Sequence, residues 1–151
     1  MQIIILGAGR VGESVAETLA SEQNDITVID PNGARLRNIE DRIEVRGVMG
    51  DGTQPSVLAA AGADNTDLFI ACTAEDAVNL VACKVAHDRF NINKTIARLR
   101  SGEFVAGDAL LAKDGFAVDQ VICPEGSVTR YMHQLIEYPE ALQVLVFSQG
   151  R

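Results

Sequence analysis

Short apolar runs alternate along the chain with longer segments in which apolar residues recur at helical spacing. Residues 3–6 form a continuous run of isoleucine and leucine, which is typical of a strand that is buried on both faces. In residues 10–22, Val11, Val15 and Leu19 fall on one side of a helix, and the glutamates fall on the other. The chain therefore opens with a strand, a glycine-rich turn and a helix.

The same alternation continues to residue 136 and predicts six strands and six helices. The predicted strands cover residues 3–6, 26–29, 44–49, 68–72, 95–99 and 118–122, and the predicted helices cover residues 10–22, 33–41, 54–61, 76–89, 103–113 and 124–136. Strands that alternate with helices in this way favour one mostly parallel sheet with right-handed connections. The predicted fold class is therefore α/β, with a doubly wound, mostly parallel six-stranded sheet and helices on both faces.

The turn after the first predicted strand reads Gly7-Ala8-Gly9-Arg10-Val11-Gly12. This spacing is a weak signal alone, but here it follows a buried strand directly and opens a helix. In addition, Asp30 closes the second strand 18 positions after Gly12 (30 − 12), against about 20 in a dinucleotide-binding fold. Gly7 allows the tight turn, Gly9 lets a pyrophosphate approach the backbone, and Gly12 lets helix and strand pack closely. These features predict a Rossmann-type domain that binds an adenine nucleotide or dinucleotide.

The predicted phosphate contacts are the free N–H groups at the positive end of the first helix. Arg10 either adds a charge to this phosphate site or is a solvated side chain at the helix start. Asp30 either accepts hydrogen bonds from the ribose hydroxyls or caps the helix that follows Pro31. Because Pro31 rather than an arginine follows Asp30, NAD(H) or ATP/ADP is favoured over NADP(H) as the ligand.

Further candidates follow later strands, because ligands bind beyond the carboxyl ends of the strands in open sheets. Asp51 and Gly52 follow the third strand, where they either approach the adenine or form an ordinary turn. Thr73 and Asn79 follow the fourth strand and are expected to face the nucleotide. Alternatively, Thr73 caps the helix at residues 76–89.

Two arginines lie at the end of the fifth predicted strand. Arg98 and Arg100 flank Leu99, so their side chains point to opposite faces or diverge where the strand ends. One of them clamps a phosphate or carboxylate, as guanidinium geometry favours, or both form surface ion pairs.

Composition and charge argue against several other functions. The formal net charge is −8 and the basic residues are dispersed, so nucleic acid is not an expected partner. Cys72, Cys83 and Cys123 lack the spacing of a metal site and are expected to be reduced, buried thiols. No apolar run approaches the about 20 residues of a membrane span, and no leader segment precedes the first strand. We therefore expect a cytoplasmic protein without a bound metal.

No catalytic residue is predicted. Hydride transfer needs a general acid or base near the nicotinamide, whereas His87 and His133 fall on predicted helices, away from the carboxyl ends of the strands. We expect a binding domain rather than an enzyme. The main alternative is the N-terminal cofactor-binding half of an NAD-dependent dehydrogenase, and a further one is an interaction module that binds no nucleotide.

The pattern changes after residue 136. Leu142, Val144 and Val146 alternate with other residues in a strand-like segment that no helix follows. We expect residues 1–136 to form the dinucleotide-binding domain and residues 137–151 to be a linker or the start of a truncated C-terminal domain. On this interpretation the chain is the N-terminal part of a longer protein.

Several of these segments resemble the TrkA family of cytoplasmic regulators of potassium uptake, whose domains are also called KTN or RCK domains. The resemblance is carried by residues 1–12, 26–30, 50–53, 73–79, 97–100, 123–125 and 138–144. It implies a domain that binds NAD(H) and ATP/ADP in one cleft and gates a membrane potassium transporter of the TrkH or TrkG type by a ligand-dependent conformational change. It also implies a homo-oligomer, either a dimer or a tetramer, held at the inner face of the cell membrane by its transporter partner.

The resemblance also implies a role for each candidate residue. The phosphates would contact the glycine turn, the ribose would contact Asp30, and the remaining candidates would surround the adenine and the rest of the nucleotide. In the family pattern, the residues that contact the phosphates are Gly7, Gly9, Arg10 and Val11. Asp51 and Gly52 would lie on the adenine side, and Thr73 and Asn79 would contact the rest of the nucleotide. Arg98 would contact a terminal phosphate or a second ribose.

Overall fold

Six strands and four α-helices make up the part of the chain that the computed structural model describes, residues 1–104 and 107–122. The strands are β1 (Gln2–Leu6), β2 (Asp25–Asp30), β3 (Arg46–Met49), β4 (Leu68–Ala71), β5 (Lys94–Arg98) and β6 (Gln120–Ile122). The helices are α1 (Arg10–Ala20), α2 (Gly33–Arg42), α3 (Pro55–Ala60) and α4 (Asp76–Phe90), with short 3₁₀ helices η1 (Ala63–Asn65) and η2 (Ala109–Leu111).

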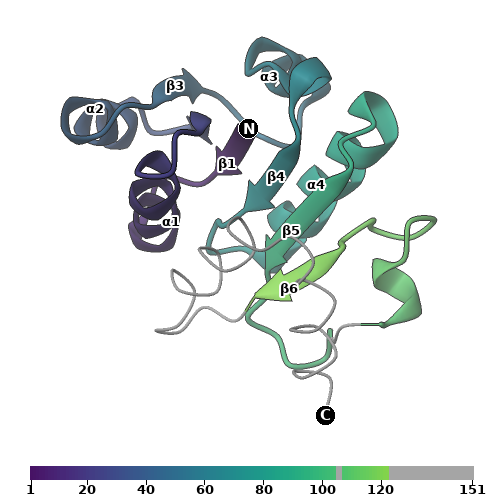
Figure 1. Ribbon diagram of the computed structural model, residues 1–151. Coiled ribbons are helices and arrows are strands. Elements are labelled where there is room, and N and C mark those ends of the chain that lie inside the picture. Colours follow the sequence, from purple (N-terminus) through teal and green to yellow (C-terminus); the bar gives the residue numbers. More distant parts are fainter. Residues whose placement is uncertain (105–106, 123–151) are drawn as a thin grey trace.

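All six strands are parallel and form one sheet in the order β3-β2-β1-β4-β5-β6. The chain runs outward from β1 through β2 to β3, and then crosses back to place β4 on the other side of β1 (Figure 1). This order confirms the predicted doubly wound fold. Because the strand order reverses between β1 and β4, the carboxyl ends of these two strands border the crevice in which such folds bind ligands.

Helices cover both faces of the sheet, as predicted (Figure 1). Alternate residues of β1 point to opposite faces, so Ile3 and Ile5 join one buried cluster while Ile4 and Leu6 join the other. The first cluster is completed by α1 and α2, and the second by α3 and α4. A strand buried on both sides explains why residues 3–6 contain no polar residue.

The predicted helix at residues 103–113 is wrong for the described residues of that range, where only η2 at Ala109–Leu111 is helical. The Asp108 side chain accepts a hydrogen bond from the backbone N–H of Leu110 at 2.9 Å and starts a single turn. That turn ends at Leu111, where Ala112 is the C-cap, and the carbonyl of Leu110 accepts a hydrogen bond from the N–H of Phe116 at 2.7 Å. Local side-chain and turn bonds thus replace the helical ladder. The predicted helix at 124–136, the strand-like segment after it and the domain boundary at 136 lie outside the described residues.

Helix α1 approaches the glycine turn so closely that only glycine fits at position 12. A Cβ atom on Gly12 would lie 1.8 Å from the carbonyl oxygen of Gly7, well inside contact distance. The absence of this one methyl group sets how near the first turn of α1 comes to the end of β1.

We expect Gly12→Ala to lower the free energy of unfolding by at least about 2 kcal/mol, because the added methyl forces α1 away from the turn. In an unconstrained helix the same change would stabilise by about 1 kcal/mol, so the sign of the effect is diagnostic. Urea unfolding followed by circular dichroism measures it. The control is Gly102→Ala, because a Cβ atom on Gly102 would have nothing within 4 Å, and this change should alter the stability by less than about 0.5 kcal/mol. Equal stability of the two variants would contradict the close approach.

Candidate functional site

A cleft of about 610 Å³ opens at the carboxyl ends of β1, β2, β4 and β5. Its volume lies within the range of small-molecule sites, about 300–1,000 Å³, and its position is the point where the strand order reverses. The residues that line it are Gly7, Gly9, Arg10, Val11, Asp30, Arg35, Cys72, Thr73, Ala74 and Arg98. Most of the predicted glycine turn and three of the predicted strand-end residues therefore share one cleft.

Asp30 connects the glycine turn to the end of β2. One carboxylate oxygen accepts a hydrogen bond from the backbone N–H of Ala8 at 2.7 Å, and the other accepts one from the N–H of Asn32 at 2.8 Å. The side chain is almost fully buried at the cleft. The alternative in which Asp30 caps α2 is wrong, because Asn32 is the N-cap and accepts hydrogen bonds from the N–H groups of Ala34 and Arg35.

The amino end of α1 faces the cleft with its N–H donors uncapped. Gly9 is the N-cap residue and has no side chain to accept hydrogen bonds from the first turn. The first N–H groups of an α-helix have no partner within the helix, and they add to the positive end of the helix dipole. Arg10 and Val11 of this first turn both line the cleft. This arrangement is suited to binding an anion.

Three arginines from three different elements line the same cleft: Arg10 from α1, Arg35 from α2 and Arg98 from β5. Arg98 donates through Nη1 to the carbonyl of Thr73 at 3.3 Å, while its buried Nε has no partner among the described residues. Among the residues that the structure describes, the lining contains one acid, Asp30, and both oxygens of that carboxylate accept backbone hydrogen bonds. The cleft is therefore locally positive in a chain of net charge −8.

Arg35 is a cleft residue that the sequence reasoning missed. Pro31 directly follows Asp30, but Arg35 reaches the cleft from the first turn of α2. The signal that was available is the predicted start of the helix near residue 33, which places Arg35 within one turn of the end of β2. The presence of Pro31 after Asp30 therefore does not by itself favour NAD(H) over NADP(H).

The paired arginines at the end of β5 are distinguished by the structure. Arg98 lines the cleft, whereas Arg100 is exposed and lies outside the lining. The backbone N–H groups of Arg100 and Ser101 donate to the two carboxylate oxygens of Asp76, both at 2.9 Å. The end of β5 is thereby attached to the first turn of α4.

Asn79 lies behind the cleft wall rather than in it. Its fully buried amide donates to the carbonyls of Thr73 and Arg98, at 3.1 and 2.7 Å, and accepts from the backbone N–H and the hydroxyl of Thr73, at 3.0 and 2.7 Å. The amide thus uses both donor hydrogens and its oxygen on the protein itself. Asn79 holds the ends of β4 and β5 together, and of the predicted pair only Thr73 lines the cleft.

Asp51 and Gly52 lie outside the cleft lining. One oxygen of Asp51 accepts hydrogen bonds from the backbone N–H and the hydroxyl of Thr53, at 2.9 and 2.7 Å, and these bonds lower the pKa of the Asp51 carboxyl. Gly52 packs against Leu6, since a Cβ atom there would lie 2.3 Å from Cδ1 of that leucine. The turn that the sequence offered as the alternative is present, and an approach to adenine stays a prediction.

Cys72, which lines the cleft, is expected to be unreactive at neutral pH. Cys72 is buried, and burial raises the pKa of its thiol to about 12, although Arg98 acts in the opposite direction. Burial also raises the pKa of the Cys83 thiol. Since the thiolate is the reactive form, neither residue supplies a nucleophile at neutral pH. Cys123 lies outside the described residues, as does His133, while His87 contacts Asp88 on α4 at 2.8 Å.

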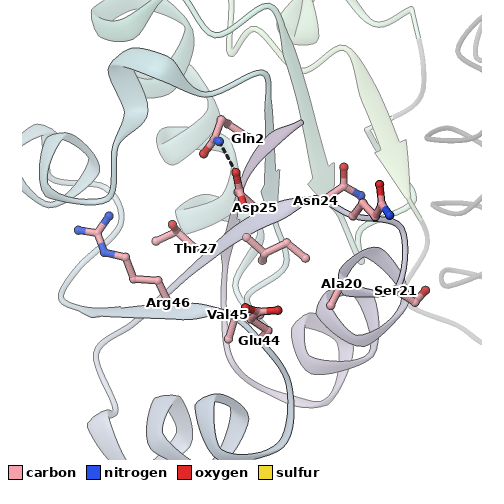
Figure 2. Close-up of a pocket in the computed structure, with 11 residues that line it drawn as sticks. Gln2, Ala20, Ser21, Asn24, Asp25, Thr27, Glu44, Val45 and Arg46 are labelled. Atoms are coloured by element: carbon pink, nitrogen blue, oxygen red, sulfur yellow. Dashed lines mark hydrogen bonds between the residues drawn. The ribbon is translucent and has the colours of Figure 1, made fainter.

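A second, larger groove of about 730 Å³ lies at the opposite edge of the sheet, near the amino ends of β2 and β3 (Figure 2). Its polar groups are largely engaged with the protein: Gln2 donates to Asp25 at 2.6 Å, and Asn24 donates to the carbonyl of Leu19 at 3.0 Å. Arg46 donates to the carbonyl of Ala60 at 2.6 Å. Size alone therefore does not select the functional site, and none of the predicted ligand contacts lines this groove. Among the described residues, no helix is long and apolar enough to cross a membrane.

The strand order, the glycine turn after β1 and Asp30 at the end of β2 define this domain as a Rossmann fold. The family model of the TrkA-N domain matches residues 3–124. The chain belongs to the TrkA-N family.

Two TrkA proteins are similar to the chain over its whole length. A Trk system potassium uptake protein TrkA from Halomonas elongata is 47% identical over 150 residues, which are 99% of this chain and 33% of the relative. A protein of the same name from Vibrio alginolyticus is 47% identical over 152 residues, covering 100% of this chain and 33% of the relative. The chain therefore spans about a third of the length of these relatives.

Solved structures share the fold at lower identity. The TrkA-N domain of the inner membrane protein ybaL from Escherichia coli has a TM-score of 0.69 at 21% identity, over 89% of this chain and 96% of that one. The GsuK channel bound to NAD has a TM-score of 0.66 at 18% identity, over 80% and 21%. The Shewanella denitrificans Kef CTD in its AMP-bound form has a TM-score of 0.65 at 19% identity, over 99% and 89%.

Burial of Cys72 predicts slow reaction with alkylating reagents. At pH 8.5 we expect the rate of iodoacetamide labelling at Cys72 to be at least about a hundredfold below that of glutathione, because the thiolate fraction of a group with a pKa near 12 is very small. Site-resolved mass spectrometry measures the rate, and the chain unfolded in urea is the control that should label rapidly. Labelling of the folded chain at the glutathione rate would contradict the burial.

Proposed function

We propose that this chain is the nucleotide-binding domain of a cytoplasmic regulatory subunit that controls potassium uptake. The domain binds NAD(H), with ATP/ADP as alternative ligands, in the cleft at the glycine turn. Ligand binding shifts the conformation of the subunit and thereby gates a membrane potassium transporter. The observation that carries this proposal is the convergence of three arginines and the uncapped amino end of α1 on one cleft.

Two sets of similar proteins support the proposal. The relatives from Halomonas elongata and Vibrio alginolyticus are named as Trk system potassium uptake proteins. Among the structures with the same fold, one is a channel bound to NAD and another is in an AMP-bound form. The first set supports the potassium role, and the second supports an adenine nucleotide as the ligand.

The predicted site residues have the following places in the proposed complex. The first-turn N–H groups of α1 and the guanidinium of Arg10 hold the phosphates. Asp30 keeps lone pairs beyond the two that accept backbone hydrogen bonds, and these accept from the ribose hydroxyls. Thr73 and Arg98 contact the far part of the ligand, and Asn79 positions both of them from behind. Asp51 and Gly52 lie on the adenine side.

Hydrogen bonds between the end of β5 and α4 connect the cleft to the rest of the domain in the proposed conformational change. Arg98 of β5 lines the cleft, and its carbonyl accepts a hydrogen bond from Asn79 of α4. Asp76, at the start of the same helix, accepts from the two N–H groups that follow Leu99. A ligand that moves Arg98 therefore moves α4. Two nucleotides switch the subunit only if they bind its alternative conformations with different affinities.

The proposed ligands fill the cleft without reacting there. Among the described residues of the lining there is no histidine or lysine, and burial raises the pKa of the thiol of Cys72 to about 12. The nucleotide is therefore a regulatory ligand rather than a co-substrate. The subunit acts as a homo-oligomer, a dimer or tetramer, at the inner face of the membrane through its transporter partner.

Isothermal titration with NAD⁺, NADH, ADP and ATP tests ligand binding. We expect NADH and ATP to compete for one site, with no change in nicotinamide absorbance during incubation. A ligand at 100 times its dissociation constant adds about 2.7 kcal/mol of stability, so a thermal shift serves as an independent readout. Oxidation of NADH with a small aldehyde would favour a dehydrogenase instead, and absence of binding by every nucleotide would contradict the proposal.

The arginine pair at the end of β5 provides a matched test of the site. We expect Arg98→Gln to weaken ATP binding by about tenfold or more, since a hydrogen bond to a charged group contributes about 1.5–3 kcal/mol. Arg100→Gln removes the same charge outside the cleft and should leave the affinity within about twofold. If both variants bind ATP equally well, Arg98 has no contact with the ligand.

A further inference from the structure

Arg35 has no role in the sequence predictions, yet it occupies a defined place over the glycine turn. It is the third residue of α2, and its backbone N–H donates to the side chain of Asn32, the N-cap. Its Nη1 atom lies 3.8 Å from the position that a Cβ on Gly9 would occupy. The cap of α2 therefore fixes the starting point from which Arg35 reaches back to the amino end of α1.

The guanidinium of Arg35 is available to a ligand. Within residues 1–104 and 107–122, its side chain forms no hydrogen bond or ion pair, and it is exposed at the edge of the cleft. Asp30 is the one acid among the described residues that line the cleft, and its two oxygens accept hydrogen bonds from the N–H groups of Ala8 and Asn32. Neither oxygen accepts a hydrogen bond from Arg35 in the part of the chain that the structure describes, so the positive charge of Arg35 is not paired with this carboxylate.

The space beside Gly9 has the chemistry of a phosphate site on two sides. The uncapped N–H groups of the first turn of α1 border it from one element, and Arg35 of α2 borders it from the other. A guanidinium presents a planar fork of donors that matches two phosphate oxygens. Arg10 belongs to α1 itself, so Arg35 is the charge that α2 contributes.

We propose that Arg35 clamps, from α2, the phosphate that lies over Gly9. This proposal rests on the proposed function, because it assigns a ligand group to the same cleft. It makes α2 part of the binding site, so that a phosphate bridges the amino ends of α1 and α2. The clamp acts on the phosphate that NADH, NADPH, ADP and ATP all place at the glycine turn, and it ignores the 2′ position of the ribose.

The test compares isothermal titrations of the chain, Arg35→Gln and Arg37→Gln with NADH, ADP and NADPH. Arg37 lies two positions further along α2, is also exposed and lies outside the cleft lining, so it is a control of equal charge. We expect Arg35→Gln to weaken NADH and ADP binding by about tenfold or more, because the variant loses at least one hydrogen bond to a charged phosphate. Arg37→Gln should change both by less than about twofold. Equal thermal midpoints of the three proteins show that the variants are folded.

The possible results separate this proposal from the proposed function. If the chain binds NADH and ADP and Arg35→Gln binds them equally well, the clamp is wrong while the nucleotide site stands. If Arg35→Gln weakens NADPH alone, Arg35 reads the 2′-phosphate and the clamp is again wrong. If the chain itself binds none of the nucleotides, the proposed function fails and the clamp fails with it.

Discussion

The site depends on one buried carboxylate. Asp30 accepts hydrogen bonds from the N–H groups of Ala8 and Asn32, and these two groups belong to the turn before α1 and the turn before α2. A buried, charge-assisted pair of hydrogen bonds of this kind is expensive to break, because the carboxylate and the donors would all lose their partners. The two helices therefore begin at fixed positions relative to each other, and the space between their amino ends is built before any ligand arrives.

This constraint also explains how an acidic protein presents a positive cleft. Asp30 is the one acid among the described residues of the lining, and its carboxylate accepts hydrogen bonds from the backbone and forms no ion pair with the arginines that approach from α1, α2 and β5. Burial of Asn79 has a comparable effect on the other wall, where its amide holds the carbonyls of Thr73 and Arg98. Hydrogen bonds to the backbone thus hold the walls of the cleft in place, and the three arginines that line it form no ion pair with a described residue. The cleft is therefore preorganised to bind an anion.

Much of this is predictable from the sequence, for identifiable reasons. A short apolar run such as residues 3–6, bounded by a glycine, is typical of a buried strand. The glycine turn between this strand and a helix, together with Asp30 at the next strand end, indicates a Rossmann crevice. The pattern of residues 103–113 predicts a helix because apolar residues recur there, but the hydrogen bond from Leu110 to Asp108 makes a single turn instead. Helical spacing does not report such local competition.

The residues that sequence reasoning misplaces are those whose side-chain direction depends on tertiary contacts. Asn79 follows a strand end, as a ligand contact would, but its amide turns inward to two neighbouring strands. The position of Arg35 in the cleft could not be predicted from the sequence, because the direction of its side chain depends on Asn32 being the residue that caps α2. Strand ends can be located by pattern, whereas the direction of a side chain in the first turn of a helix follows from the cap.

The most direct test of the account is where a nucleotide binds. Backbone amide shifts of the ¹⁵N-labelled chain should be followed while NADH is added. We expect the largest shifts at residues 7–11 and at Thr73, with little change at residues 20–27 beside the larger groove of Figure 2. Large shifts at residues 20–27 with none at the glycine turn would contradict the central claim.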